Sequence, residues 1–194
     1  MAEIRGPGDI LVVSVGEKSF RSIAGLIDRS LYARIIDVHT GAEARRLLPG
    51  RSFSLVVINA PLSDEFGHEL ASDIAEQYAC GVVLLAKSDV IDEVNALVQS
   101  AGVITVPKPV SRQAFEQAVR VGLSESIRLL AWEQEISRLK RKLEEARLVG
   151  RAKCMLVEQR GYSEAEAHRY IEKKAMDRRV SLRDIAEEII RENE

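Results

Sequence analysis

The N-terminal half of the chain contains several short apolar runs, and most of them finish at a polar or small residue. If these runs are parallel strands, their last residues meet at one edge of a sheet, where such sheets place their ligand chemistry. The residues expected at that edge are Ser14, Val15, Asn59, Ala86 and Lys108. They supply a hydroxyl, an amide and an ammonium group but no carboxylate. The set therefore predicts neither a metal site nor a catalytic nucleophile, because an amide is a poor nucleophile and Mg²⁺ prefers carboxylate ligands.

A second group of chemically active residues is cationic and lies in the C-terminal third. Residues 138–183 contain 14 Lys and Arg and 7 Asp and Glu, a net charge of +7, whereas residues 1–127 contain 12 and 16, a net charge of −4. A basic segment in a chain of net charge −2 suggests a polyanionic partner for that segment alone. The alternative is a solvated helical face, which charge counting by itself favours.

Five apolar runs alternate with five helical patterns over the first 122 residues. The strands are expected at 9–15, 32–38, 54–59, 81–86 and 103–106. Helices are expected around 20–27, 40–48, 67–78, 91–100 and from 113 onwards. This alternation predicts a doubly wound, five-stranded parallel sheet in a first domain, residues 1–122. Because only helical patterns follow it, the fold class of the whole chain is α/β plus all-α.

The last of these helices can continue without a breaker into a heptad pattern. Gly122 is its weak point, at a cost of about 1 kcal/mol relative to alanine. The a and d residues, which we call the seam, are Leu129, Trp132, Ile136, Leu139, Leu143 and Ala146. A seam this narrow needs a partner helix. The pattern therefore predicts a coiled-coil homodimer through residues 123–150, and the alternative is a seam that packs within one chain.

The charges beside the seam favour a parallel pair along most of its length. In a parallel pair, each g residue faces the e residue of the next heptad on the partner helix. The attractive pairs are Arg128–Glu133 and Glu135–Lys140, and the repulsive pair is Lys142–Arg147. We therefore expect a parallel dimer whose helices diverge near Arg147.

Residues 140–194 are expected to form a three-helix domain that shares its first helix with the coiled coil. Gly161 can end the first helix, because glycine accepts the left-handed conformation common at that position. Ser163 and Glu166 form a capping box for the second helix, and Ser181 can cap the third. Apolar residues recur at helical spacing in all three segments, which predicts a small bundle.

The first domain resembles the receiver domain of bacterial response regulators over roughly residues 8–122. Lys108-Pro109 matches the Lys-Pro pair of that family, whose peptide bond is usually cis. Gly67 keeps the family's spacing from the site of phosphorylation. Receivers carry an acidic pair for Mg²⁺ after the first strand, a phosphoacceptor aspartate after the third and a hydroxyl residue after the fourth. Here those positions hold Ser14 and Val15, Asn59, and Ala86.

With these replacements, the resemblance implies a pseudo-receiver that keeps the fold without the phosphorylation chemistry. Lys108 is then expected to bond with Asn59 or with nearby carbonyls. Glu17 and Asp64 are carboxylates in the region, but neither has the spacing of a displaced ligand. Control is expected to come from a regulatory protein partner, from a ligand-sensing protein that sequesters the dimer, or from changed dimerisation.

The last domain is similar to the ANTAR domain, an RNA-binding module of bacterial transcription antiterminators. The similarity is carried by residues 152–156, 161–167, 175–176 and 178–186. Three positions depart from the family: Cys154 replaces a glycine, His168 an aromatic residue and Glu172 a basic residue. The resemblance implies that a dimer binds paired hairpins in a nascent leader transcript, one per protomer, and so prevents an overlapping terminator from forming.

Proteins that read RNA sequence hold its backbone with cations and stack unpaired bases on rings. The cations available for this are Arg147, Arg151, Lys153, Arg169, Lys173, Lys174, Arg178, Arg179 and Arg183. Among them we single out Lys153, Arg178 and Arg179. His168 is the expected stacking ring, because Tyr170 has the spacing of a core residue.

Several classes of protein are disfavoured by the rest of the sequence. No apolar run reaches the length of a membrane helix, and the first eight residues lack the pattern of a signal peptide. Cys80 and Cys154 have no metal-ligand spacing, so we interpret them as reduced thiols of a cytoplasmic protein. No catalytic constellation, metal site or cofactor is predicted, because the histidines are scattered and no serine has a placed histidine.

The leading hypothesis is a non-enzymatic, RNA-binding antiterminator. A DNA-binding regulator with a helix-turn-helix variant is one alternative, although residues 181–194 are acidic at their end, which is unfavourable for a recognition helix. A protein-interaction scaffold is the other alternative.

Overall fold

The computed structural model describes residues 8–193. Residues 1–7 and Glu194 lie outside the described residues, and so does most of the N-terminal segment that was compared above with a signal peptide. The chain divides into two compact units, Met1–Glu133 and Gln134–Glu194. The long helix α5 (Arg112–Arg160) contributes to both units. No helix within residues 8–193 is long and apolar enough to cross a membrane.

The first unit contains a parallel sheet that, within the described residues, has five strands in the order β2-β1-β3-β4-β5. The strands are β1 (Asp9–Ser14), β2 (Ile35–Val38), β3 (Phe53–Asn59), β4 (Gly81–Lys87) and β5 (Ile104–Lys108). The prediction of a doubly wound parallel sheet is confirmed. The second strand starts at Ile35, later than expected, and a 3-10 turn at Arg29–Leu31, capped by Asp28, lies before it.

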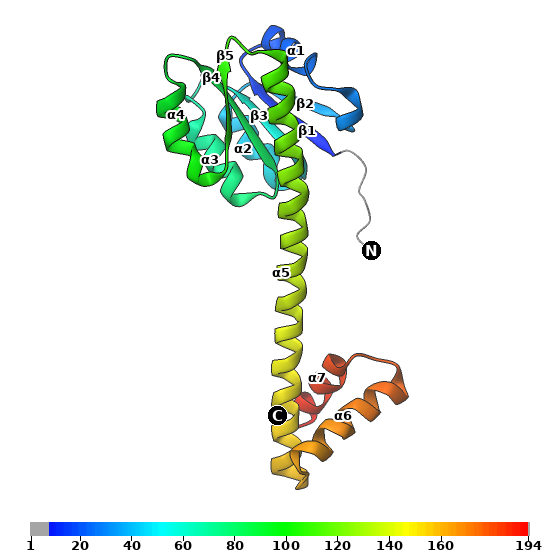
Figure 1. The fold of residues 1–194 in the computed structure, drawn as a ribbon. Helices are drawn as coiled ribbons and strands as arrows, with labels where there is room; N and C mark the ends of the chain where they lie inside the picture. The colour runs from blue at the N-terminus through cyan, green and yellow to red at the C-terminus, as the bar shows by residue number, and fades with distance from the viewer. Residues whose placement is uncertain (1–7, 194) are drawn as a thin grey trace. The chain divides into compact units, whose positions relative to one another are not determined.

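Helices cover both faces of this sheet (Figure 1). They are α1 (Glu17–Ala24), α2 (Gly41–Leu47), α3 (His68–Gln77), α4 (Ile91–Val98) and the first part of α5. Alternate residues of the central strands enter two separate cores, as the period of two in a strand requires. Leu11 and Val13 pack on the side of α2, α3 and α4. Ile10 and Val12 pack on the side of α1 and α5.

The backbone of α5 lies directly against the sheet at Gly122. A Cβ atom added to Gly81 at the start of β4 would lie 2.2 Å from the carbonyl oxygen of Gly122, and one added to Gly122 would lie 2.6 Å from Leu55 Cδ1. The interpretation of Gly122 as a weak point of the helix was therefore incomplete. The missing side chain of Gly122 costs helix propensity, but it leaves room for the buried side chain of Leu55, and the backbone of Gly122 lies where Gly81 has no Cβ.

The second unit is a bundle formed by the last part of α5, α6 (Glu164–Arg178) and α7 (Leu182–Asn193), counted within the described residues. Each helix contributes one apolar stripe to its core. The most buried residues are Val149, Ala152, Leu156, Ala167, Ile171, Ala175, Ile185, Ala186, Ile189 and Ile190. The expected bundle is thus confirmed.

The predicted helix ends of this unit are also present. Gly161 follows α5 with φ 67°. Ser163 and Glu166 make the reciprocal bonds of a capping box at the start of α6. Ser181 Oγ accepts from the backbone N–H of Asp184 at 3.1 Å before α7. Each cap satisfies backbone groups that the helix itself leaves unpaired.

Replacing Gly122 with alanine is expected to lower the free energy of unfolding by about 1–3 kcal/mol, because the added methyl group has no space beside Leu55. Gly150→Ala is the matched control on the same helix, since a Cβ there meets no atom within 4 Å. It is expected to stabilise by up to about 1 kcal/mol through helix propensity. Urea unfolding followed by circular dichroism measures both changes, and equal effects would contradict the close contact.

Candidate functional sites

The strand register brings the predicted edge residues together. Ser14 at the end of β1 pairs with Asn59 at the end of β3. Lys87 at the end of β4 pairs with Lys108 at the end of β5. Ser14 is fully buried, and its hydroxyl oxygen has no hydrogen-bond partner among the described residues. The edge thus presents an amide, a buried hydroxyl and two ammonium groups where the strands end.

Two other edge residues are apolar. Val15 is 47% exposed directly after β1, and Ala86 is fully buried near the end of β4. Neither can contribute an oxygen ligand from its side chain. Within residues 8–193, no three or more His, Cys, Asp and Glu side chains are grouped so that they could hold a metal ion. These residues therefore do not fit Mg²⁺, which takes carboxylate oxygens and water in proteins.

Lys108 is engaged with the backbone of the neighbouring loop. Its Nζ donates a hydrogen bond to the carbonyl oxygen of Ala60, one of the kinds of contact that the sequence predicts. Burial, and secondarily the charge of Lys87, lower the pKa of Lys108. The Lys108–Pro109 peptide bond is cis, as the receiver resemblance implies. Lys108 is thus bonded within the protein at this edge.

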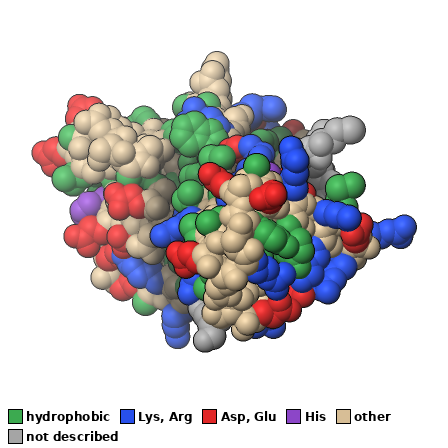
Figure 2. All heavy atoms as spheres, turned by 90° about the horizontal axis from the view of Figure 1, so that it is seen from below, with side chains coloured by type: hydrophobic (Ala, Val, Ile, Leu, Met, Phe, Trp, Pro, Cys, Tyr) green, Lys and Arg blue, Asp and Glu red, His purple; other side chains and the backbone are tan. Residues whose placement is uncertain are grey.

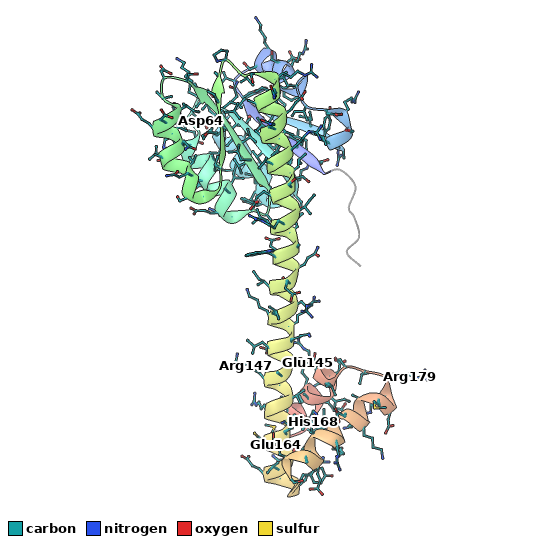
Figure 3. All side chains as sticks on the ribbon, viewed as in Figure 1. Asp64, Glu145, Arg147, Glu164, His168 and Arg179 are labelled. Atoms are coloured by element: carbon teal, nitrogen blue, oxygen red, sulfur yellow. The ribbon has the colours of Figure 1, made fainter. Side chains whose placement is uncertain are left out.

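The carboxylates near this edge have structural partners of their own. The two carboxylate oxygens of Asp64 accept from the backbone N–H groups of Gly41 and Ala42, each at 3.0 Å, at the start of α2. These bonds lower the pKa of Asp64, which Figure 3 labels in the first unit. Glu17 forms an ion pair with Arg21 on α1. Asp64 therefore acts as a helix cap, a role that the sequence analysis did not recognise.

Asp37 on β2 is a further acidic residue that the sequence analysis did not select. One of its oxygens is buried without a partner among the described residues, and the other lies 3.8 Å from His39 Nε2. Burial raises the pKa of Asp37, and Glu17 and Glu43 add to the increase while His39 opposes it. His39 Nδ1 lies 3.1 Å from the carbonyl oxygen of Ser14. This arrangement joins β1 to the end of β2.

Several predicted RNA-binding cations in the second unit have carboxylate partners. Lys153 Nζ lies 2.8 Å from Glu164 Oε1 and joins α5 to α6. Glu188 on α7 accepts from Lys174 at 3.0 Å and from Arg178 at 2.6 Å, which joins α6 to α7. Lys174, followed by Arg178, lowers the pKa of Glu188.

Arg183 is paired within α7, where its Nε lies 2.7 Å from Glu187. Together with the pairs between helices, this contact shows that part of the positive charge counted from the sequence is balanced inside the bundle. These cations can meet an outside phosphate only in competition with their own carboxylates.

Other predicted cations are exposed and form no ion pair within residues 8–193. These are Arg147, Arg169, Lys173 and Arg179. Arg169 and Lys173 lie one turn apart on α6, and the side chain of Met176, 78% exposed, follows on the same face. Arg179 has φ 56° at the end of α6. Arg147 on α5, His168 on α6 and Arg179 after α6 are marked in Figure 3.

The two rings near these cations differ in exposure. His168 is exposed, with Nε2 3.3 Å from Glu172. Tyr170 is half-buried, packs edge-on against Tyr162 at 5.8 Å between ring centroids and accepts from Arg160 at 3.3 Å. Tyr170 thus has the core-like position that its spacing indicates, and His168 is available at the surface. Over the face shown in Figure 2, Lys and Arg side chains are interspersed with Asp and Glu.

The seam of α5 is largely exposed in the isolated chain. Trp132 is 65% and Leu143 63% exposed, with Ile136 and Leu139 near half exposure. In the second unit, α5 instead buries Ala152 and Leu156, which lie about a third of a turn away from the seam at 100° per residue. Packing against α6 and α7 therefore leaves the seam face of α5 free for another partner.

Comparisons with known proteins match both the C-terminal bundle and the chain as a whole. The family model of the ANTAR domain matches residues 137–190. The transcriptional regulatory protein PdtaR of Mycobacterium tuberculosis is 27% identical over 168 residues, which cover 87% of this chain and 82% of that protein.

Several solved structures share the fold of the first unit, and among them is a signal receiver domain. The signal receiver domain of an HD domain-containing protein from Pseudomonas fluorescens Pf-5 has 23% identity and a TM-score of 0.58, and the match covers 70% of this chain and 97% of that one. A two-component transcriptional regulator AraC from Clostridium phytofermentans has 16% identity and a TM-score of 0.58, covering 63% and 98%. At these identities the likeness shows the receiver fold.

Proposed function

We propose that this chain, which has an ANTAR match over residues 137–190 and a receiver-like fold in its first unit, is a transcription antitermination regulator that binds hairpins of a nascent leader transcript. The observation that carries this proposal is the ANTAR match over a bundle whose exposed Arg169, Lys173 and Arg179 form no ion pair within residues 8–193. Such cations bind phosphates without first breaking an ion pair.

Within the bundle, we assign the main phosphate contacts to Arg169 and Lys173 on α6 and to Arg179 after it. Their exposure and their lack of an ion pair within residues 8–193 support this assignment. Of the residues singled out from the sequence, Lys153 and Arg178 hold carboxylates, so their first role is to fasten the bundle. His168 is the exposed ring on which an unpaired base would stack.

The active species is a parallel homodimer through the seam. Exposed apolar side chains in a row are unusual on a monomer and mark an interaction surface. The seam face of α5 is separate from the face buried by α6 and α7. Dimerisation therefore leaves each bundle able to bind one hairpin.

The receiver-like domain acts without phosphorylation. The amide of Asn59 replaces the nucleophile, and Ser14 and Val15 replace the metal-binding acids. The nearby carboxylate of Asp64 is bonded to two backbone N–H groups. A protein partner or a ligand is therefore the expected input to this domain.

RNA binding is tested with Lys173→Gln and its neighbour Lys174→Gln. Lys173 is exposed, whereas Lys174 is paired with Glu188. We expect Lys173→Gln to weaken binding of a two-hairpin leader RNA by about 1 kcal/mol and to reduce the salt dependence by about one ion. Lys174→Gln is expected to change RNA affinity less and bundle stability more.

The measurement is a gel shift at several salt concentrations with duplex DNA as the competitor. If the unaltered protein forms no complex with the RNA, the proposed RNA binding is contradicted. Preferential competition by duplex DNA would favour a DNA-binding regulator instead.

Phosphorylation is tested by incubating the protein with acetyl phosphate and Mg²⁺ and measuring its intact mass. We expect no stoichiometric phosphoryl adduct, because Asn59 has no carboxylate to accept the group. The control is Asn59→Asp, which restores the nucleophile alone and is also expected to remain unmodified, since the metal ligands are still missing. An adduct on the unaltered chain would contradict the assignment of a degenerate site.

The seam register is tested with Lys142→Glu. Lys142 faces Arg147 of the partner in a parallel pair, so the reversed charge converts a repulsive contact into an attractive one. We expect a several-fold tighter dimer by sedimentation equilibrium at low salt, since such a pair contributes about 0.3–0.5 kcal/mol or more. Arg141→Glu makes the same charge change at an outward position and serves as the control. An unchanged constant for Lys142→Glu, or equal changes for both variants, would contradict the register.

A further inference from the structure

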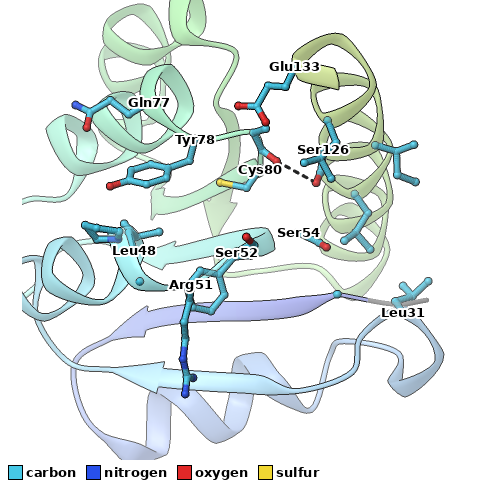
Figure 4. Close-up of a pocket in the computed structure, with 18 of the residues that line it drawn as sticks. Leu31, Leu48, Arg51, Ser52, Ser54, Gln77, Tyr78, Cys80, Ser126 and Glu133 are labelled. Carbon is cyan, nitrogen blue, oxygen red and sulfur yellow. Dashed lines mark hydrogen bonds between the residues drawn. The ribbon is translucent and has the colours of Figure 1, made fainter. Parts of the chain in front are cut away.

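The first unit contains a cleft of about 950 Å³ at the edge of the sheet where the strands begin. Phe53, the first residue of β3, lines it together with Cys80, which precedes β4, and Gly8, which precedes β1. This edge is opposite the one that carries Ser14, Asn59 and Lys108. Figure 4 shows the cleft between the loops at the starts of the strands and one side of α5.

One wall of the cleft is made by α5, where the helix continues past the sheet. Leu123, Ser126, Ile127, Leu130 and Glu133 line it. Ser126 Oγ donates to the carbonyl oxygen of Ala79 at 3.4 Å, a weak bond between this wall and the loop before β4 (Figure 4). The other wall comes from residues 48–54 and from the 77–80 loop. An occupant would therefore touch the sheet and the outgoing helix at once.

The lining suits an uncharged ligand with an apolar body. Leu48, Phe53, Cys80 and Leu130 contribute apolar surface, and Arg51 and Glu133 are the charged residues of the lining within the described chain. Serine hydroxyls and the phenol of Tyr78 are placed to orient polar groups (Figure 4). The volume lies within the range of small-molecule sites, which combine apolar walls with a few polar groups.

The predicted dimer does not account for the apolar residues of this wall. Ile127 and Leu130 occupy f and b positions of the heptads that the seam defines, and these positions face away from a partner helix. Ile127 is nevertheless 71% exposed. A second cavity of the same unit is smaller, about 250 Å³, and is lined by Asp28, Arg112, Glu116 and Arg120, which makes it too charged for such a ligand.

We propose that this cleft, bounded by residues 48–54, 77–80 and 123–133, binds a small uncharged molecule with an apolar body and one or two hydroxyl or carbonyl groups. Its regulatory part rests on the proposed function. Because the occupant contacts the sheet loops and α5 together, its binding is linked to the position of α5 and hence to dimerisation through the seam. The cleft thus supplies an input at the edge opposite the degenerate phosphorylation site.

Nile red, a neutral and planar fluorophore, is the probe for binding to the full chain without RNA. We expect a saturable rise in its emission with one site per chain. Ile127→Asp is expected to weaken binding at least about tenfold, because it places an unpaired charge at the mouth of the cleft. Val121→Asp is the matched control, since Val121 is 58% exposed on the same helix and does not line the cleft.

Leu139→Asp tests whether the dye binds the exposed seam instead. Loss of binding in this variant but not in Ile127→Asp would overturn the proposal, as would unsaturable binding or equal loss in all variants. Circular dichroism confirms that each variant is folded. The titration contains no RNA, so its failure leaves the proposed RNA binding unaffected, and failure of RNA binding leaves the cleft unaffected.

The link to α5 is tested by sedimentation equilibrium with and without saturating Nile red. We expect the dimer constant of the unaltered protein to shift at least about threefold and that of Ile127→Asp to remain unchanged, because only an occupant that binds the two states unequally moves the equilibrium. Binding of the dye without any shift in the unaltered protein would overturn the regulatory part of the proposal.

Discussion

Both units depend on the burial of different stretches of one helix. In the first unit, Phe115 and Val119 of α5 are buried against the sheet, and in the second unit Ala152 and Leu156 are buried against α6 and α7. Helical propensity alone does not hold a helix in water, so these packed stretches supply most of its stability. The residues between them carry the seam. The sequence of α5 therefore changes character twice, from a stretch that packs on the sheet to the exposed seam and then to a stretch that packs in a small bundle.

These changes of environment explain why the sequence predicts so much of the fold. The buried strands are apolar on both faces, and the seam narrows to a and d positions where α5 leaves the sheet. Helix ends were also recoverable, because a cap such as Ser163 with Glu166 uses side chains only three residues apart. Local signals of this kind involve residues that are close in the sequence, so they can be recognised without knowledge of tertiary contacts.

Contacts between distant segments were not recoverable in the same way. Asp64 caps α2 from 23 residues downstream, and Gly81 and Gly122 meet across the interface of α5 with the sheet. Neither partner could be identified from spacing. The same holds for charge: Lys173 and Lys174 are adjacent and chemically identical, yet only Lys174 reaches Glu188. A charge count gives the sign of a surface, whereas the fold determines which cations remain available to phosphate.

The edge of the sheet that carries Ser14, Asn59 and Lys108 bears on how the receiver-like unit can be controlled. A switch needs two states of similar free energy and an input that binds them unequally. At this edge, Lys108 is bonded to the carbonyl of Ala60, and Asp64 fixes the loop after β3 to α2. Both bonds are internal and need no phosphoryl group, so they favour one arrangement. At the opposite edge, the backbone of α5 lies against Gly81 at Gly122, and one turn later Ser126 donates a 3.4 Å hydrogen bond to the carbonyl oxygen of Ala79. A molecule bound in the cleft would contact α5 in the turns that follow Gly122, where the helix leaves the sheet.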